Sequence, residues 1–190
     1  MALLNKIGFW FFIAVIVFSV ATITYVKDDS FFGLNADTFS GVTLLEGDTQ
    51  VFFCPEDNCA QNLIERIDLA KETINIAIYS FTNDDIADAL IRAKARGVEV
   101  KVVFDYVQSS SEYSDDEKLI EAGIEIKRRN ASGSMHNKFA VIDAETVATG
   151  SFNYSQNADQ KNDENLLFIK NAVLAQKYSD EFNELWQQSD

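Results

Sequence analysis

The chain has 190 residues, of which 30 are acidic and 16 are basic, so its formal net charge is −14. A chain of this length holds one domain of about 140 residues and an N-terminal segment. The acidic balance argues against a protein that binds nucleic acid over its whole surface, because such binding draws on Lys and Arg contacts with phosphates. The single histidine excludes any site that needs two imidazoles from one copy of the chain.

An almost unbroken apolar run covers residues 7–26. It has the length of a bilayer-spanning helix, which needs about 20 apolar residues, and it lacks the polar face of a helix packed on a core. Lys6 precedes the run, and positive charge on that side favours an extracytoplasmic location for the C-terminal domain. The alternative is a signal peptide cleaved after Ser19, Val20 and Ala21, which would leave a secreted or periplasmic protein. We therefore expect an anchor or signal peptide at 1–27, a linker at 28–48 and a folded domain at 49–190.

Apolar strands and amphipathic helices alternate along 49–190, which indicates an α/β sandwich with a mixed central β-sheet flanked by helices. The strands are expected at 49–53, 73–81, 98–105, 124–127, 138–142, 147–149 and 166–169. One helix is expected at 60–70, and a second runs from the N-cap Asn83 to a stop at Gly97. A capping box at 114–117 begins a short helix that stops at Gly123. Apolar residues at helical spacing mark a last amphipathic helix, namely Leu174, Tyr178, Phe182 and Leu185.

Two cysteines bracket the turn between the first strand and the first helix. In an oxidising compartment Cys54 and Cys59 could form a disulfide that closes a small loop. The alternative is a pair of buried or free thiols. We do not expect a catalytic cysteine, because the one histidine of the chain belongs to a different motif.

That motif spans residues 135–143 and has the form H-x-K-x4-D, beginning at His136. Imidazole can act as nucleophile, base or acid near neutral pH. Because side chains alternate between the faces of a strand, His136 and Lys138 share one face and can meet one phosphate together. The Lys138 ammonium would stabilise negative charge in the transition state. Asp143 falls on the opposite face, so we interpret it as structural.

A second group of polar residues lies C-terminal to the motif. Gly150 permits a turn or a close approach of the backbone. Ser151 and Asn153 share one face and offer neutral donors to phosphate oxygens. Glu164 stands at the start of an apolar strand, where it can accept the second ring N–H of His136 and stabilise the imidazolium. Asp163 is the alternative for this role.

The stretch from His136 to Asn165 resembles the signature of the phospholipase D superfamily. The closer resemblance is to its small single-motif members, the bacterial endonuclease Nuc and the Zucchini/mitochondrial phospholipase D group, and it covers most of residues 49–188. The resemblance implies that His136 is the nucleophile and that Glu164 orients it. It assigns phosphate binding to three residues, Lys138, Ser151 and Asn153.

Single-motif members of this superfamily bring two histidines together by dimerising, so the resemblance implies a homodimer with one site at its twofold interface. One His136 attacks phosphorus to form a phosphohistidine, and the partner's His136 protonates the leaving oxygen and then activates water. The resemblance implies neither a metal nor another cofactor. A symmetry argument also supports a dimer, because a twofold axis brings two copies of one residue into a single shared site.

Three consecutive basic residues, Lys127, Arg128 and Arg129, precede the motif and can form the rim of the site, where they would attract an anionic substrate. The alternative is a solvated strand end. The leading prediction is a phosphodiesterase that acts on nucleic acid. The apolar N-terminal run motivates the alternative, a phospholipid phosphodiesterase or phosphatidyl transferase of the phospholipase D or cardiolipin hydrolase type. A third possibility is a membrane-tethered protein that binds phosphate without catalysis. The presence of all the motif residues argues against it.

Overall fold

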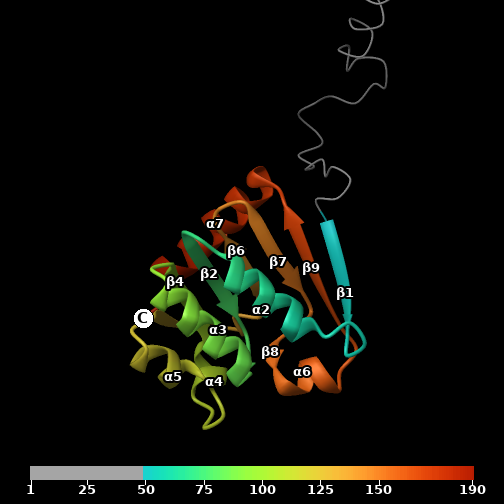
Figure 1. The fold of residues 1–190 in the computed structure, drawn as a ribbon. Coiled ribbons are helices and arrows are strands. Elements are labelled where there is room, and N and C mark those ends of the chain that lie inside the picture. The colour runs from blue at the N-terminus through green and yellow to red at the C-terminus, as the bar shows by residue number, and fades with distance from the viewer. Residues whose placement is uncertain (1–48) are drawn as a thin grey trace, which may run out of the picture. The chain divides into compact units, whose positions relative to one another are not determined.

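A seven-stranded β-sheet forms the middle layer of the domain in the computed structural model, which describes residues 49–190 (Figure 1). The strands are β1 (Thr49–Cys54), β2 (Thr73–Ile78), β4 (Glu99–Asp105), β5 (Glu125–Arg129), β6 (Lys138–Ile142), β7 (Thr146–Gly150) and β9 (Glu164–Lys170). They lie in the order β1-β9-β7-β6-β2-β4-β5. The predicted anchor or signal peptide at 1–27 and the linker at 28–48 lie outside the described residues. Within 49–190, no helix is both long and apolar enough to cross a bilayer.

The sheet is mixed, as predicted. β2, β4 and β5 run parallel, whereas β6, β7, β9 and β1 join the sheet by antiparallel pairing. Ile78 at the end of β2 pairs with Lys138 at the start of β6, and Gly150 at the end of β7 pairs with Leu166 near the start of β9. Four strand ends that are far apart in the sequence therefore meet at one edge of the sheet.

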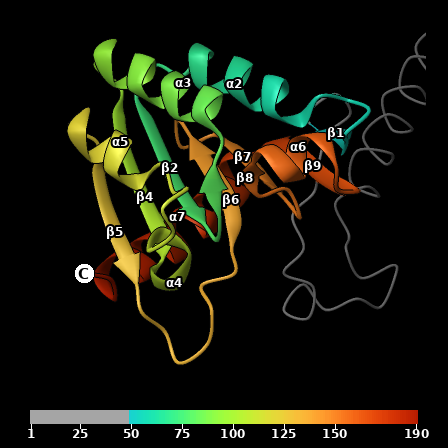
Figure 2. The same cartoon turned by 90° about the horizontal axis from the view of Figure 1, so that it is seen from below.

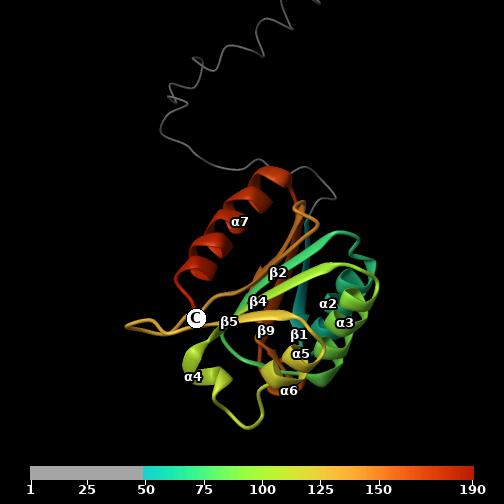
Figure 3. The ribbon, with the colours of Figure 1, turned by 90° about the vertical axis from the view of Figure 1, so that its left-hand side faces the viewer.

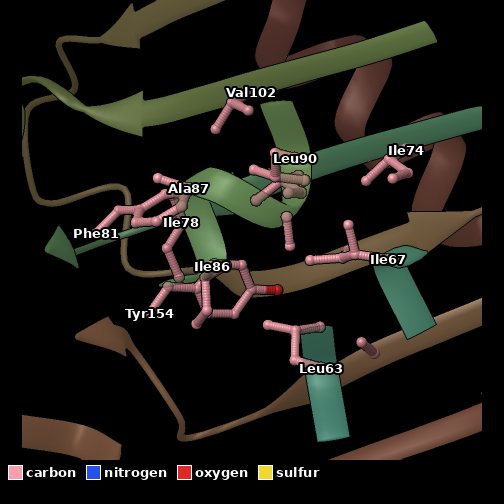
Figure 4. Packing of buried hydrophobic residues seen from close by; sticks show 14 of the residues in the cluster. Leu63, Ile67, Ile74, Ile78, Phe81, Ile86, Ala87, Leu90, Val102 and Tyr154 are labelled. Atoms are coloured by element: carbon pink, nitrogen blue, oxygen red, sulfur yellow. The ribbon is translucent and has the colours of Figure 1, made fainter. Parts of the chain in front are cut away.

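Helices cover both faces of the sheet (Figure 3). α2 (Cys59–Leu69) and α3 (Asp84–Ala95) pack on one face, and α7 (Ala172–Gln187) packs on the other. The alternation along β6 serves both cores, because Ala140 lies in the cluster on the α2 and α3 side and Phe139 lies in the cluster on the α7 side. Side chains of α2, α3 and β2 interlock in the larger core (Figure 4), among them Leu63, Ile67, Leu90, Ile74 and Ile78.

Four short elements are not predicted from the sequence: β3 (Phe81–Thr82), α4 (Tyr106–Ser109), β8 (Tyr154–Ser155) and α6 (Gln156–Gln160). β3 and β8 pair in parallel to form a separate two-stranded sheet, so the strand expected at 73–81 ends at Ile78. Each of these elements is too short to establish the periodicity by which a helix or strand is recognised in a sequence.

The predicted capping box at 114–117 is wrong. α5 (Asp116–Glu121) has Asp115 as its N-cap residue, and no side-chain hydrogen bond caps it. The box needs the Ser114 N–H to donate to the Glu117 carboxylate, but this N–H donates to the Ser111 carbonyl oxygen at 3.0 Å and Glu117 pairs with Arg128. In contrast, Asn83 caps α3 as predicted by accepting from the N–H groups of Asp85 and Ile86.

Cys54 and Cys59 form a disulfide, with their Cα atoms 5.7 Å apart. The bond joins the end of β1 to the start of α2, and both residues are buried in the larger core. Of the two alternatives for these cysteines, the structure therefore has the disulfide.

Candidate active site

The residues of the H-x-K motif lie at the sheet edge where β2 and β7 end and β6 and β9 begin. His136 occupies the loop just before β6 and is exposed, whereas Lys138 is the first residue of β6 and is half-buried. The other candidates stand at neighbouring strand ends, with Ser151 and Asn153 after β7 and Glu164 at the start of β9. The sheet therefore positions side chains that come from three separate stretches of sequence.

His136 and Lys138 are in direct contact. Lys138 Nζ lies 3.2 Å from His136 Nδ1 and donates to the His136 carbonyl oxygen at 2.9 Å. Burial lowers the pKa of the Lys138 ammonium, and the nearby Glu164 carboxylate partly opposes this shift. A hydrogen bond from Lys138 to Nδ1 leaves the proton of a neutral imidazole on Nε2.

Tyr79 supports both groups and is not predicted from the sequence as a site residue. Its ring centroid lies 4.4 Å from that of His136, and Lys138 Nζ lies 4.9 Å from the Tyr79 centroid. The Tyr79 N–H also donates to the Asn137 carbonyl oxygen at 2.9 Å, which extends the pairing of β2 with β6 by one residue. A ring face attracts an ammonium group electrostatically. In the sequence, Tyr79 is only an aromatic residue just after a strand. It can be recognised as a site residue only once β2 is known to lie beside β6.

Gly150 and Ser151 bring the end of β7 against β9. Gly150 has φ +154°, and a Cβ atom there would collide with the Asn165 carbonyl oxygen, so a side chain does not fit. Ser151 Oγ accepts from Asn165 N at 3.1 Å and from Asn165 Nδ2 at 3.3 Å. Both bonds use lone pairs of the hydroxyl oxygen, which leaves the Ser151 proton free to donate to a phosphate.

Glu164 and Asn153 do not contact His136 directly. Glu164 Oε1 accepts from Asn162 Nδ2 at 3.2 Å, and within residues 49–190 no hydrogen bond joins this carboxylate to the imidazole. Asn153 Oδ1 is buried and lacks a hydrogen-bond partner in the same part of the chain. Asp163, the alternative acid, is exposed. The roles of these residues toward His136 stay predictions.

Asp143 lies at the opposite end of β6 from the site. Its carboxylate accepts from the backbone N–H groups of Lys71, Glu72 and Thr73 at 2.8–3.1 Å. Partial burial opposes ionisation, but these donors outweigh it and lower the pKa of Asp143. The carboxylate thus ties the turn after β6 to the start of β2 and takes no part at the His136 end.

Residues 63–186 match the family described as cardiolipin synthase, PLD-like domain. A phospholipase D from Rickettsia bellii (strain RML369-C) is 38% identical over 126 residues, which cover 66% of this chain and 63% of that protein. A mitochondrial cardiolipin hydrolase from Xenopus tropicalis is 33% identical over 140 residues, covering 72% and 67%. The structure of Nuc from Salmonella typhimurium, a phospholipase D family member, matches with a TM-score of 0.72 at 34% identity, covering 75% of this chain and 95% of that one. The chain belongs to the phospholipase D superfamily.

The phospholipase D resemblance of the stretch from His136 to Asn165 is thereby confirmed, and it extends over most of the described domain. The chain spans less than two thirds of the length of the Rickettsia bellii phospholipase D. Within residues 49–190, no three His, Cys, Asp or Glu side chains gather in a way that would hold a metal ion.

The basic triplet of this phospholipase D domain lies on β5, the outermost strand, and β4 and β2 separate it from β6. Arg129 pairs with Asp105 at the end of β4, so it stands at the same sheet edge as His136 but several strands away. Each cation has a partner in the domain: Ser189 and Trp186 for Lys127, Asp116 and Glu117 for Arg128, and Gln188 for Arg129. The structure therefore does not bring the triplet to His136.

Proposed function

We propose that the chain is a phosphodiesterase that cleaves nucleic-acid phosphodiester bonds through a phosphohistidine intermediate on His136. The observation that carries the proposal is the 3.2 Å contact between Lys138 Nζ and His136 Nδ1, at an edge where Ser151 also keeps a free hydroxyl proton. A nucleophile, a cation and a neutral donor are the groups that phosphoryl transfer needs. The names of the relatives, phospholipase D and cardiolipin hydrolase, support cleavage of a phosphodiester.

The reaction has two displacements at phosphorus. A ring nitrogen of His136 attacks, so that a P–N bond forms while the bond from phosphorus to the leaving oxygen breaks. The His136 of a second copy gives its proton to that oxygen. The same imidazole then takes a proton from water, whose oxygen attacks phosphorus and breaks the P–N bond, releasing a phosphate monoester. Lys138 and Ser151 stabilise negative charge on the non-bridging oxygens in both steps.

The ring tautomer gives Glu164 its role. When Lys138 donates to Nδ1, the neutral ring carries its proton on Nε2, which then cannot attack. A bound phosphate competes for the Lys138 ammonium and frees Nδ1 to take up the proton. Glu164, close enough to affect the pKa of Lys138, is the carboxylate that would then accept the Nδ1–H and stabilise the imidazolium.

A dimer is supported by a part of the sheet that α7 leaves open. Within the described residues, α7 packs mainly on β2, β4, β5, β6 and β7, while Val51 and Phe53 on β1 are 50% and 59% exposed. We call these two residues the β1 strip. Phe53 pairs with Asn165, which binds Ser151, so the strip reaches the edge that holds the site. An exposed apolar strip that ends beside half of a symmetric site suits a twofold interface.

Nucleic acid is the favoured substrate because the motif from His136 to Asn165 resembles that of the bacterial endonuclease Nuc. The fold supports this choice, since the solved structure of Nuc matches the chain with a TM-score of 0.72 at 34% identity.

The test uses the full chain in detergent with EDTA present. Single- and double-stranded DNA, RNA, and vesicles containing phosphatidylcholine or cardiolipin are compared as substrates. We expect nucleic acid to be cut, and His136→Ala to lower the rate at least about a thousandfold, since it removes the nucleophile. Lys138→Met should also reduce the rate, whereas Lys170→Met, which changes a lysine at the far end of β9, should not. Cleavage that survives His136→Ala, or that requires added magnesium, would contradict the proposal.

A phospholipid substrate is the second candidate, favoured by the names of the relatives and by the apolar run at 7–26. Release of headgroup from the vesicles with all nucleic acids intact would establish it in place of the first. The same His136→Ala control applies, because the chemistry at phosphorus is shared.

A further inference from the structure

Asp105 is a buried carboxylate whose hydrogen-bond partners are backbone N–H groups, and within residues 49–190 it forms no ion pair. It is the last residue of β4 and is 3% exposed. Its Oδ1 accepts from the N–H groups of Val107 and Gln108, both at 3.0 Å, and so caps α4. Its Oδ2 accepts from the N–H of Met135 at 2.9 Å, across 30 positions of sequence. Burying a carboxyl group is costly unless hydrogen bonds satisfy it, so aspartate is an unusual choice for a buried strand end unless these bonds have a role.

Met135 directly precedes His136, in a loop that is otherwise held weakly. The loop between β5 and β6 extends from the body of the domain (Figure 2). Ser132, Gly133 and Ser134 are exposed, and within the described chain their backbone groups make no hydrogen bonds. The Met135 N–H is therefore the first backbone group after this exposed stretch that is bound to the rest of the domain.

His136 thus lies between two anchors. On one side Asp105 binds the Met135 N–H, and on the other the Tyr79 N–H binds the Asn137 carbonyl oxygen at 2.9 Å. The Met135 side chain, 4% exposed, adds packing in the core on the α7 side. Two fixed neighbours determine where the His136 Cα atom lies, and from there the imidazole reaches Lys138.

We propose that Asp105 is a positioning residue for His136, acting through the Met135 N–H to hold the imidazole against Lys138 and Tyr79. The inference rests on the proposed function for its effect on turnover, but the placement of the ring can be measured without any substrate. A displacement of a nucleophile by about 1 Å can cost about a hundredfold in rate. The ground-state affinity for substrate should change little, because Asp105 is buried and does not reach the substrate.

The most informative variant is Asp105→Ser. Serine is as good an N-cap residue as aspartate, so α4 keeps its cap, but the hydroxyl is too short to reach Met135. We expect kcat to fall about tenfold to a hundredfold with KM nearly unchanged. Asp105→Asn, whose amide oxygen can still cap α4 while its NH2 faces the Met135 N–H, should act in the same direction. The matched control is Asp115→Asn, another buried aspartate near this edge, which does not bind the loop and should leave kcat unchanged.

The second readout is the NMR signal of His136, which is unambiguous in a protein purified without a polyhistidine tag, since the chain has one histidine. In Asp105→Ser the ring signals should shift or broaden, and their response to inorganic phosphate should weaken, while the melting temperature confirms folding. If Asp105→Ser does not fold, Asp105→Asn carries the same comparison. An unchanged His136 signal in a folded variant overturns the proposal, whether or not kcat falls. If the wild type cleaves no phosphodiester, the proposed function fails and the NMR comparison alone decides the role of Asp105.

Discussion

Tyr79 gives the imidazole and the ammonium of the site a common surface. Its ring lies against His136 and beneath Lys138 Nζ, and its backbone N–H donates to the carbonyl oxygen of Asn137, which lies between them in the sequence. The ring therefore limits the positions of two groups that would otherwise move separately. Because an ammonium over an aromatic face is stabilised by about 0.5–1 kcal/mol at an exposed site, this contact is strong enough to matter in the rate.

Replacing Tyr79 tests this role. Tyr79→Leu removes the ring and should lower kcat about twofold to fivefold, whereas Tyr79→Phe keeps the ring and should stay near the wild-type rate. The measurement is the dependence of initial rate on substrate concentration for both variants. An equal loss in Phe and Leu would show that the hydroxyl, and not the ring face, is the group that matters.

Asp115 is a buried carboxylate that, unlike Asp105, is not fully hydrogen-bonded. It is 8% exposed, and its Oδ2 has no hydrogen-bond partner within the described chain. Burial, with the charge of Asp84 next in size, raises the pKa of Asp115 to about 6. The folded state then binds this proton more tightly than the unfolded state, so the ionised side chain reduces stability above pH 6. The reduction disappears below the ordinary carboxyl pKa, near pH 4.

Asp115→Asn should therefore raise the free energy of unfolding at pH 7 by at most about 3 kcal/mol, from 1.36 kcal/mol for each unit of pKa. The gain should shrink to nothing near pH 4. Denaturant unfolding at both pH values measures it. An equal gain from Asp115→Asn at both pH values would show that the effect is not one of ionisation.

Asp143→Asn should lower the free energy of unfolding at pH 7, because the pKa of Asp143 is lowered and its ionised form stabilises the fold.

At the scale of residues, the sequence predicts contacts within one strand and not contacts between strands. The meeting of His136 and Lys138 follows from alternation along a single segment. Tyr79 and Asp105 reach the site through the pairing of β2 with β6 and the position of β4, neither of which local spacing contains. Arg129 illustrates the converse, because closeness in sequence to His136 does not make it a neighbour in the sheet.

Among the elements, β1 combines two roles. Its Phe52 and Cys54 face the larger core, while Val51 and Phe53 point to the other side and stay at least half exposed. The sequence predicts the strand and its alternation but not which face stays open, because that depends on the sheet order and on where α7 packs. The short strands β3 and β8 are equally beyond local pattern, since they form by pairing with each other across the fold.

Phe53→Glu tests the β1 strip as a dimer interface. The side chain is exposed in one copy, so the variant should fold with a similar melting temperature, but a charge at the interface should yield monomers and abolish turnover. Sedimentation velocity and activity measure the two effects. Leu69→Glu is the matched control, an exposed apolar residue on α2 at the opposite face of the sheet, and it should leave both unchanged. A dimeric, active Phe53→Glu would place the interface elsewhere.

The whole molecule is acidic, with a formal net charge of −14. Arg128 forms ion pairs with Asp116 and Glu117, and Arg129 hydrogen-bonds Gln188 on the outermost strand, so Lys138 is the cation in contact with His136 among the described residues. Selectivity for an anionic substrate must then come from a small number of contacts at the sheet edge and not from the field of the whole protein. This resolves the conflict between a phosphate-directed motif and a formal net charge of −14.

The salt dependence of binding should accordingly be shallow. One Lys138 from each of two copies gives a slope of about −1.4 in log Kobs against log salt concentration for single-stranded DNA, at about −0.7 per contact. The His136→Ala variant, which binds without turnover, allows the measurement by fluorescence anisotropy. A slope steeper than about −4 would mean that further cations, such as the triplet on β5, contact the substrate.

A dimer that contains one normal copy and one His136→Ala copy tests most directly whether two histidines share one site. Its substrate is a nucleotide p-nitrophenyl ester, whose leaving group departs without needing a proton. The single His136 should then release one equivalent of nitrophenolate per mixed dimer and stop, because no second imidazole is present to activate water, and mass spectrometry should find the phosphoryl group on His136. Steady turnover at half the wild-type rate, with no adduct on His136, would contradict a site shared by two histidines.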